Sequence, residues 1–239
     1  VDGLTGLVEN NSIWLGDDPS STTDSASYNV ALGTTALDAI TTGDGNAAIG
    51  YGALGVNTTG SENSALGKGA LDANIEGDGN TAVGLDALGG NTADANTAVG
   101  SNASRLNTTG TRNTSVGRKA MEDNTEGNDN VGIGYAALET NTDADNNTAV
   151  GSYALTANTT GAGNVAIGKD ALDSNTTGSS NTAIGTDALQ AATTRTQLVA
   201  VGFEAGKLTE GVNANNSVFV GYQAGAAVTN AGNLICIGS

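Results

Sequence analysis

Acidic side chains in polar loops are the residues of this sequence best suited to chemistry. Asp44 and Asp78 stand in GDGN segments, Asp129 stands in GNDN, and Asp143 and Asp145 stand in DADNN. Carboxylate and amide oxygens are the ligands that hard cations such as Ca²⁺ prefer. The spacing matches neither an EF-hand loop nor the nonapeptide calcium repeat. Calcium binding at these residues and plain solvated acidic turns therefore both stay open, and we favour the turns.

Catalytic constellations are scarce in this chain. It has no His and a single cysteine, Cys236, so the usual metal and Ser-His-Asp arrangements cannot form. Paired carboxylates such as Asp143 and Asp145 can act as acid and base, but an enzyme also needs a shaped cleft. We therefore predict no catalytic residue, no enzymatic activity and no cofactor apart from the calcium alternative.

The elements that carry the acidic loops are set by a recurring glycine. Of the thirteen intervals between its copies, eleven are 17 residues, one is 16 and one is 19. A fixed short period over nearly the whole length predicts a stacked repeat protein. The copies are Gly16, Gly33, Gly50, Gly67, Gly84, Gly100, Gly117, Gly134, Gly151, Gly168, Gly185, Gly202, Gly221 and Gly238.

The repeating unit has the pattern N-T-A-V-G-x-x-A-L-x-x-N-T-T-G-x-x, as in the stretch that starts at Asn147. Its N-T-A-V-G segment is rich in β-branched residues and predicts a strand. The G-x-x-A-L segment indicates a tight turn into a second, shorter strand, and N-T-T-G-x-x indicates a return loop. The unit is too short for a helix pair, so we predict an all-β solenoid of about fourteen turns. Asn side chains at equivalent places should form ladders between turns.

The composition limits the partners and the cellular environment that we expect for this chain. The net charge is −17, which argues against nucleic-acid binding and keeps an extended chain soluble. No apolar run is long enough to suggest membrane insertion. The single cysteine excludes a disulfide within one chain. The chain lacks an initiator Met and a signal-peptide pattern, so we expect a processed product or a piece of a longer protein.

The predicted strand has two apolar faces. In N-T-A-V-G the Ala and the Val must point to opposite sides, and no charged residue enters this segment from Asn29 to Gly185. One face would line the coil interior, and the other would form an apolar stripe larger than a monomer normally exposes. We therefore predict self-association along this stripe, with cyclic symmetry.

The terminal repeats depart from the pattern. The Ala position of the strand becomes Trp14 near the start, and Phe219 and Cys236 near the finish. The Leu position becomes Gly206 and Gly225. We therefore divide the chain into a lead-in or cap (residues 1–11), regular repeats (residues 12–206) and atypical repeats (residues 207–239) that join a missing downstream region.

The strings NSALG, NTAVG and NVAIG resemble the head repeats of trimeric autotransporter adhesins of the YadA type. The resemblance implies a left-handed β-roll packed as a parallel homotrimer, although the return loop here is longer. The NTTG-containing unit is similar to repeats of phage tail fibre and tailspike-like proteins. The segments NSVFVGYQAG and GNLICIGS resemble the stretch that precedes an endosialidase-type intramolecular chaperone, which implies assisted trimerisation and a cut near Ser239.

These features predict a structural or adhesive extracellular protein. The expected function is the shaft or head of a phage or viral fibre that attaches to a host surface, with a cell-surface glycan or protein as receptor. The alternatives are a bacterial or archaeal surface adhesin, or a monomeric solenoid that binds ice or another ligand. The ice alternative depends on a partial row of return-loop threonines. The sequons at Asn57, Asn107, Asn158 and Asn175 follow from the Asn- and Thr-rich composition.

Overall fold

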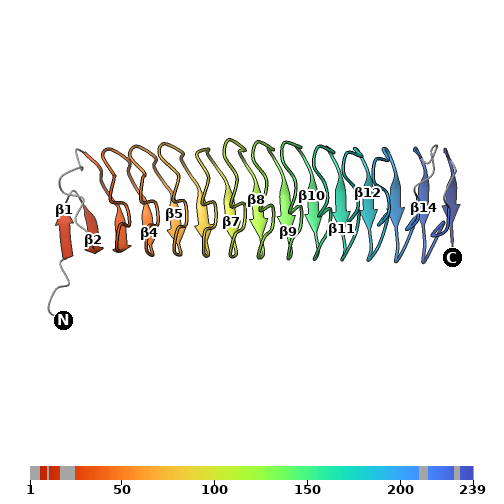
Figure 1. Ribbon diagram of the computed structural model, residues 1–239, viewed down its shortest axis with the longest axis horizontal. Coiled ribbons are helices and arrows are strands. Elements are labelled where there is room, and N and C mark those ends of the chain that lie inside the picture. The colour runs from red at the N-terminus through yellow and green to blue at the C-terminus, as the bar shows by residue number, and fades with distance from the viewer. Residues whose placement is uncertain (1–5, 10, 17–24, 210–214, 229–231, 239) are drawn as a thin grey trace. The chain divides into compact units, whose positions relative to one another are not determined.

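The chain folds as an all-β parallel β-solenoid in the computed structural model (Figure 1). The structure describes residues 6–9, 11–16, 25–209, 215–228 and 232–238, and no helix occurs among them. Two compact units divide the chain, Val1–Arg118 and Lys119–Ser239. Within each unit, successive strands lie side by side in the order of the sequence.

The first unit starts with an antiparallel pair and continues in parallel. β1 runs antiparallel to β2, and from β2 to β8 each strand pairs in parallel with the next. The strands are β1 (Gly6–Glu9), β2 (Ser12–Gly16), β3 (Val30–Gly33), β4 (Ala47–Ile49), β5 (Ser64–Leu66), β6 (Thr81–Val83), β7 (Thr97–Val99) and β8 (Thr114–Val116).

In the second unit all strand pairs are parallel and join consecutive strands. The register joins equivalent positions of the repeat, for example Ala166 with Ala183. The strand predicted for N-T-A-V-G is confirmed in both units. The strands are β9 (Val131–Ile133), β10 (Thr148–Val150), β11 (Val165–Ile167), β12 (Thr182–Ile184), β13 (Val199–Val201), β14 (Val218–Val220) and β15 (Ile235–Ile237).

The second strand predicted for each turn is wrong. After the recurring Gly185 the chain runs through turns, with positive φ angles of 57° at Asp187 and 53° at Leu189. A strand requires negative φ and would point neighbouring side chains to opposite faces. Here Ala188 and Leu189 are adjacent in sequence and both fully buried. The left-handed backbone at Leu189 therefore lets each turn contribute two consecutive side chains to the core.

Two features of the backbone require glycine at the recurring position. At Gly151 the φ angle is 140°, a backbone conformation that residues with a side chain rarely adopt. A Cβ on Gly151 would also lie only 2.5 Å from the carbonyl oxygen of Gly168 in the next turn. The close stacking of corners along the solenoid therefore fixes the period that the sequence shows.

The core is thin because each turn fills it with small side chains. Three columns run through the interior of each unit: the middle residue of each strand, the Ala three residues after the glycine, and the Leu that follows this Ala. Trp14 and Phe219 are the largest fully buried side chains of the described residues. Such a core is consistent with the low aromatic content of the chain.

The irregular intervals affect the return loops. The shortened segment, residues 91–95, lies between β6 and β7, outside both strands. The lengthened segment, residues 207–216, follows β13, but residues 210–214 lie outside the described part. Pro19 and much of the predicted lead-in, residues 1–5 and 10, also lie outside the described residues.

Candidate functional site

Three of the five candidate cation ligands tie neighbouring turns together. The Oδ1 atoms of Asp44, Asp78 and Asp145 each accept a backbone N–H from the preceding turn, at 2.7 Å in every case. For Asp145 this donor is the amide of Asn128, whose side chain also reaches the same oxygen at 3.2 Å. These carboxylates therefore hold the return loops in register, a role that the sequence pattern did not reveal.

The remaining two candidates lie at exposed positions. Asp143 lies 3.1 Å from the hydroxyl of Thr142, whose one hydrogen is shared between this carboxylate and the carbonyl of Thr159, and Asp129 occupies a turn with a φ angle of 58°. In the described part of the chain, no three His, Cys, Asp or Glu side chains gather closely enough to hold a metal ion. The structure therefore does not bring the five candidates together, and calcium binding stays a prediction.

The return-loop threonines use their hydroxyl hydrogens internally. Thr142 donates through Oγ1 to the carbonyl of Thr159, and Thr159 donates in the same way to Thr176, at 3.2 and 3.0 Å. The same bond forms at Thr41, Thr58, Thr92, Thr125 and Thr176. This row therefore links neighbouring turns, and its hydroxyl hydrogens are used within the protein, with that of Thr142 shared with Asp143.

Two buried columns of asparagine confirm the predicted ladders. In the column that opens each strand, the backbone N–H of Asn164 donates to Oδ1 of Asn147 at 2.9 Å. In the return-loop column, Nδ2 of Asn158 donates to Oδ1 of Asn141 and to the carbonyl of Gly161, both at 2.9 Å. The sequon asparagines belong to this second column and are fully buried: Asn57, Asn107, Asn158 and Asn175. Their side chains are thus structural in the folded chain.

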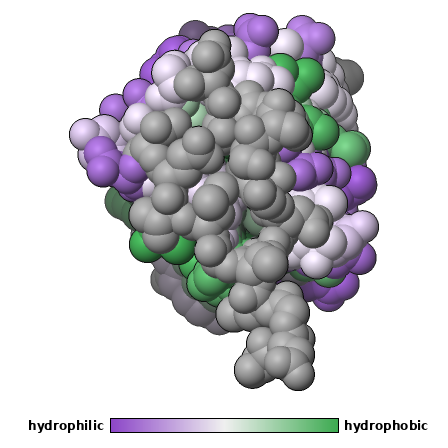
Figure 2. Space-filling view, turned by 90° about the vertical axis from the view of Figure 1, so that its left-hand side faces the viewer, coloured by the Kyte–Doolittle hydropathy of each residue, from purple (hydrophilic) through white to green (hydrophobic). Residues whose placement is uncertain are grey.

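The outward side of the strands forms an apolar surface. In each unit, the residues directly before and after the buried middle residue of each strand from β3 to β14 point outward, and we call these flanking residues the outer strand face of that unit. No charged residue belongs to it. Ten of its Val, Ile and Leu side chains are 36–48% exposed: Val30, Leu32, Ile49, Leu66, Val99, Ile133, Ile167, Ile184, Val201 and Val220. In the end-on view of Figure 2, hydrophobic residues also gather in patches with hydrophilic residues between them.

Charged side chains gather on a different surface, where the chain turns after each glycine. We call the first, second and fifth residues after the recurring glycine the turn face. On it, Lys207 bridges Asp187 at 2.9 Å and Glu204 at 2.8 Å. Lys119 bridges Glu122 and Glu139 in the same manner, at 2.8 and 2.9 Å. Each lysine therefore joins a carboxylate of its own turn to one of a neighbouring turn.

These contacts change the acidity of the turn-face groups. Hydrogen bonds from Lys207 and Gln223 lower the pKa of Glu204, and hydrogen bonds to Glu204 and Asp187 raise the pKa of Lys207. Partial burial raises the pKa of Asp173, and the neighbouring charges of Asp170 and Asp187 raise it further. The turn face thus holds both paired and mutually repelling charges.

Exposed aromatic side chains also lie on the turn face of the second unit. The rings of Phe203 and Tyr222 are stacked, with centroids 5.4 Å apart and planes 12° from parallel. The rings of Tyr135 and Tyr153 meet edge to face at 5.2 Å. Sequence reasoning missed both pairs. The signal that could have found them is their position one or two residues after the recurring glycine.

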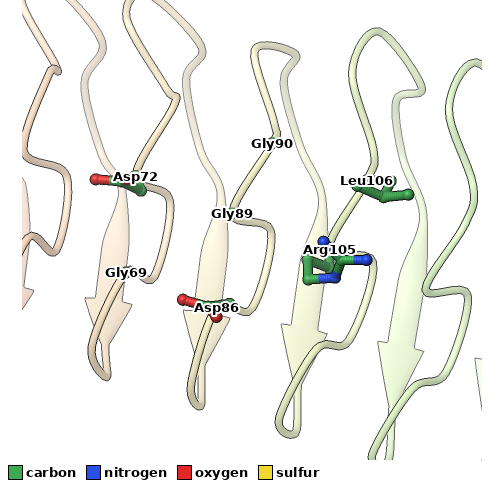
Figure 3. A pocket seen from close by; sticks show the side chains of 7 residues that line it. All are labelled: Gly69, Asp72, Asp86, Gly89, Gly90, Arg105 and Leu106. Carbon is green, nitrogen blue, oxygen red and sulfur yellow. The ribbon is translucent and has the colours of Figure 1, made fainter.

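A shallow hollow of about 290 Å³ opens on the first unit, where the turn carries Gly89 and Gly90 in place of larger residues (Figure 3). Asp72 and Asp86 lie on one side of these glycines and point away from Arg105, which lies on the other side together with Leu106. The charged groups therefore border the hollow without converging on one point in it.

Cys236 packs against the core of the second unit from the middle of β15. This position is the small buried slot predicted from the repeat, although Cys236 is only partly buried. The middle residues of the strands face the coil interior, so the thiol does not belong to the outer strand face.

None of the described segments is a helix with the length and apolarity needed to cross a bilayer. Comparison of the chain with family models, with curated proteins and with solved structures gave no match.

Proposed function

We propose that this chain forms the shaft or head of an extracellular fibre that attaches a phage or virus to a host surface. In this proposal three parallel copies associate along the outer strand face, and each copy is a left-handed β-roll of about fourteen turns. The receptor is a cell-surface glycan or protein, and the chain acts mechanically, without a catalytic step.

The outer strand face is the observation that carries the proposal. In each unit it presents a column of Val, Ile and Leu side chains, and ten of these side chains are more than one third exposed. Contiguous apolar surfaces of this extent mark association sites in soluble proteins. In parallel copies the same repeat positions lie side by side, so the apolar strand residues of one copy contact the apolar strand residues of the next.

Charge favours a second copy at this face. The chain carries a net charge of −17, so two copies repel one another across their acidic surfaces. The outer strand face has no charged residue, and it is therefore the surface along which identical chains can meet at the lowest electrostatic cost. A cellular adhesin or surface filament would use the same face and remains the alternative setting.

The contacts of the return-loop threonines support a fibre over an ice-binding monomer. Their hydroxyl hydrogens bond to backbone carbonyls of the next turn, as at Thr159 and Thr176. An ice-binding surface made of this row would have to present these hydroxyls to water. A thermal hysteresis assay on the purified protein tests this alternative directly.

Solution mass tests the proposed association. Light scattering after size exclusion should give three times the chain mass of 23.3 kDa. The double variant Ile167→Glu, Ile184→Glu places two charges on the outer strand face and should shift the protein to monomer. The matched control Thr160→Glu, Thr177→Glu adds the same charge at exposed return-loop positions and should keep the wild-type mass.

Circular dichroism on both variants checks that the solenoid still folds. A wild-type protein that is monomeric at micromolar concentration, or an unchanged mass in the strand-face variant, would refute association along this face.

A further inference from the structure

The distribution of aromatic side chains suggests a second functional surface. The chain has eight aromatic residues, and only Trp14 and Phe219 are buried. The other six are exposed, and four of them form the Phe203–Tyr222 and Tyr135–Tyr153 pairs on the turn face of the second unit. Large exposed rings contribute nothing to a core of Ala and Leu columns, so their pairing on one face calls for a role outside the core.

The Phe203–Tyr222 pair presents a broad apolar surface. Phe203 is 42% exposed and Tyr222 is 60% exposed even though their rings stack on one another. Each ring directly follows a recurring glycine whose corner stacks closely on the next turn, and the two rings also stack on one another. Two side chains with few rotatable bonds are thereby held in one orientation, which lowers the entropy lost on binding a ligand.

Polar groups flank this pair in a connected network. Gln223 donates through Nε2 to Glu204 at 2.6 Å, and Lys207 donates to Glu204 at 2.8 Å and to Asp187 at 2.9 Å. Glu204 and Gln223 directly follow Phe203 and Tyr222 in the sequence, so the network runs beside the rings. The Gln223 amide retains its carbonyl oxygen as an acceptor.

The second pair has the same kind of neighbour. Tyr135 and Tyr153 lie on the turn face that carries Lys119 and its bridge to Glu139. Tyr135 and Phe203 are equivalent residues four turns apart, which corresponds to about 19 Å along stacked strands. The surface therefore has two aromatic sites with charged hydrogen-bonding groups beside each one.

We propose that the turn face of the second unit binds a linear glycan of neutral pyranose sugars, with Phe203–Tyr222 as the main contact and Tyr135–Tyr153 as a further one. The C–H groups of a sugar ring pack on aromatic carbon, and its hydroxyls bond to carboxylate, ammonium and amide groups. Both chemistries are present side by side here. The proposal rests on the proposed attachment function and names the class of receptor.

Charge restricts the glycan to a neutral one. Residues 119–239 contain four Lys or Arg and twelve Asp or Glu, for a net charge of −8. An acidic polysaccharide would be repelled over the length of this unit. Lys119 and Lys207 are each held between two carboxylates, and Lys169, whose charge acts on Tyr153, is paired with Asp170 at 2.8 Å, so all three lysines already have a carboxylate partner.

Titration of the full chain with defined oligosaccharides tests the proposal. Maltohexaose, cellohexaose and chitohexaose serve as neutral probes and a hyaluronan hexasaccharide as the acidic one, with calorimetry or saturation-transfer NMR as readout. At least one neutral probe should bind, and the Phe203→Ala, Tyr222→Ala variant should weaken that binding at least tenfold. Tyr51→Ala removes an equally exposed ring from the first unit and should leave the affinity unchanged.

The proposal is overturned if no neutral probe binds, if the hyaluronan probe binds more tightly, or if the double variant keeps wild-type affinity. Light scattering on the same variant separates this result from the proposed association. A changed mass would assign the rings to the contact between copies and overturn the glycan site. A monomeric wild type whose sugar binding is lost in the double variant would refute association and support the glycan site.

Discussion

The large side chain of Phe219 is compensated by the missing side chain of Gly206 in the neighbouring turn of the solenoid. Phe219 takes the middle strand position that is Ala in most turns, and a Cβ added to Gly206 would lie 2.8 Å from its Cδ2 atom. Gly206 occupies the position of Leu in other turns, where Leu189 adopts nearly the same φ angle, 53° against 60°. Close side chains, Phe219 first and Leu189 at 2.9 Å next, therefore leave no room for a side chain at residue 206, although Leu is tolerated at this φ angle in other turns. Gly225, in the following turn, makes room for the same ring.

This compensation predicts strong coupling between the three positions. Gly206→Leu alone should overpack the core and cost about 1–3 kcal/mol, and Phe219→Ala alone should leave a cavity and cost about 3–5 kcal/mol. The triple variant Phe219→Ala, Gly206→Leu, Gly225→Leu restores the standard turn and should cost less than about 1.5 kcal/mol. Urea unfolding at a fixed protein concentration measures these values. Additive losses in the triple variant would contradict the compensation of volume.

The strand-opening asparagine ladder should be a main source of stability. Asn147 accepts hydrogen bonds from the backbone and side chain of Asn164, and it donates to the carbonyl of Gly161. Asn147→Ala leaves these buried groups without a hydrogen-bond partner, and each unsatisfied group costs about 1–3 kcal/mol. We therefore expect a loss of at least about 2 kcal/mol in urea unfolding. Thr148→Ala, on the outward side of the same strand, should change stability by less than about 0.5 kcal/mol, and equal losses in both variants would argue against the ladder.

The return-loop asparagine ladder ends where the sequence changes, which predicts a stabilising substitution. Ala192 stands where the pattern calls for the next Asn, and the buried Oδ1 atom of Asn175 has no hydrogen-bond donor. Ala192→Asn would bring an amide to this oxygen, as Asn175 does for Asn158 at 2.9 Å. We expect a gain of about 1 kcal/mol, the typical net value of one hydrogen bond. A lower melting temperature for Ala192→Asn would show that the loop cannot accept the larger side chain.

The sequence predicted the solenoid because its period is enforced by close backbone contact. Stacked corners such as Gly151 and Gly168 leave no space for a side chain, so the same residue type must return in every turn. The strand and the asparagine ladders could be predicted for the same reason, because each position meets its own copy in the next turn. Repetition thus converts a three-dimensional contact into a pattern along the chain.

The parts that could not be predicted depend on local backbone geometry and on contacts between unlike positions. The adjacent Ala188 and Leu189 look like a strand segment in sequence, but the positive φ angle at Leu189 turns both side chains inward. Asp44 resembles a cation ligand in the sequence, but in the structure its carboxylate accepts a hydrogen bond from the Ser27 amide of the preceding turn. The Phe203–Tyr222 pair occurs once in the described residues, so no repetition marks it.

The acidic cluster around Asp173 should make stability depend on pH. Burial, Asp170 and Asp187 raise its pKa above the ordinary value of 3.8, so the folded state binds a proton more tightly than the unfolded state. This group therefore favours folding below pH 3.8, and that contribution is lost as the pH rises through its folded pKa. Asp173→Asn should raise the melting temperature at pH 7, by the equivalent of about 0.2–1 kcal/mol for partly exposed charges, with little change at pH 3. Asp143→Asn removes the same charge from a return loop and should give a smaller rise at pH 7. Equal rises in the two variants would assign the effect to the net charge of the chain and not to the cluster.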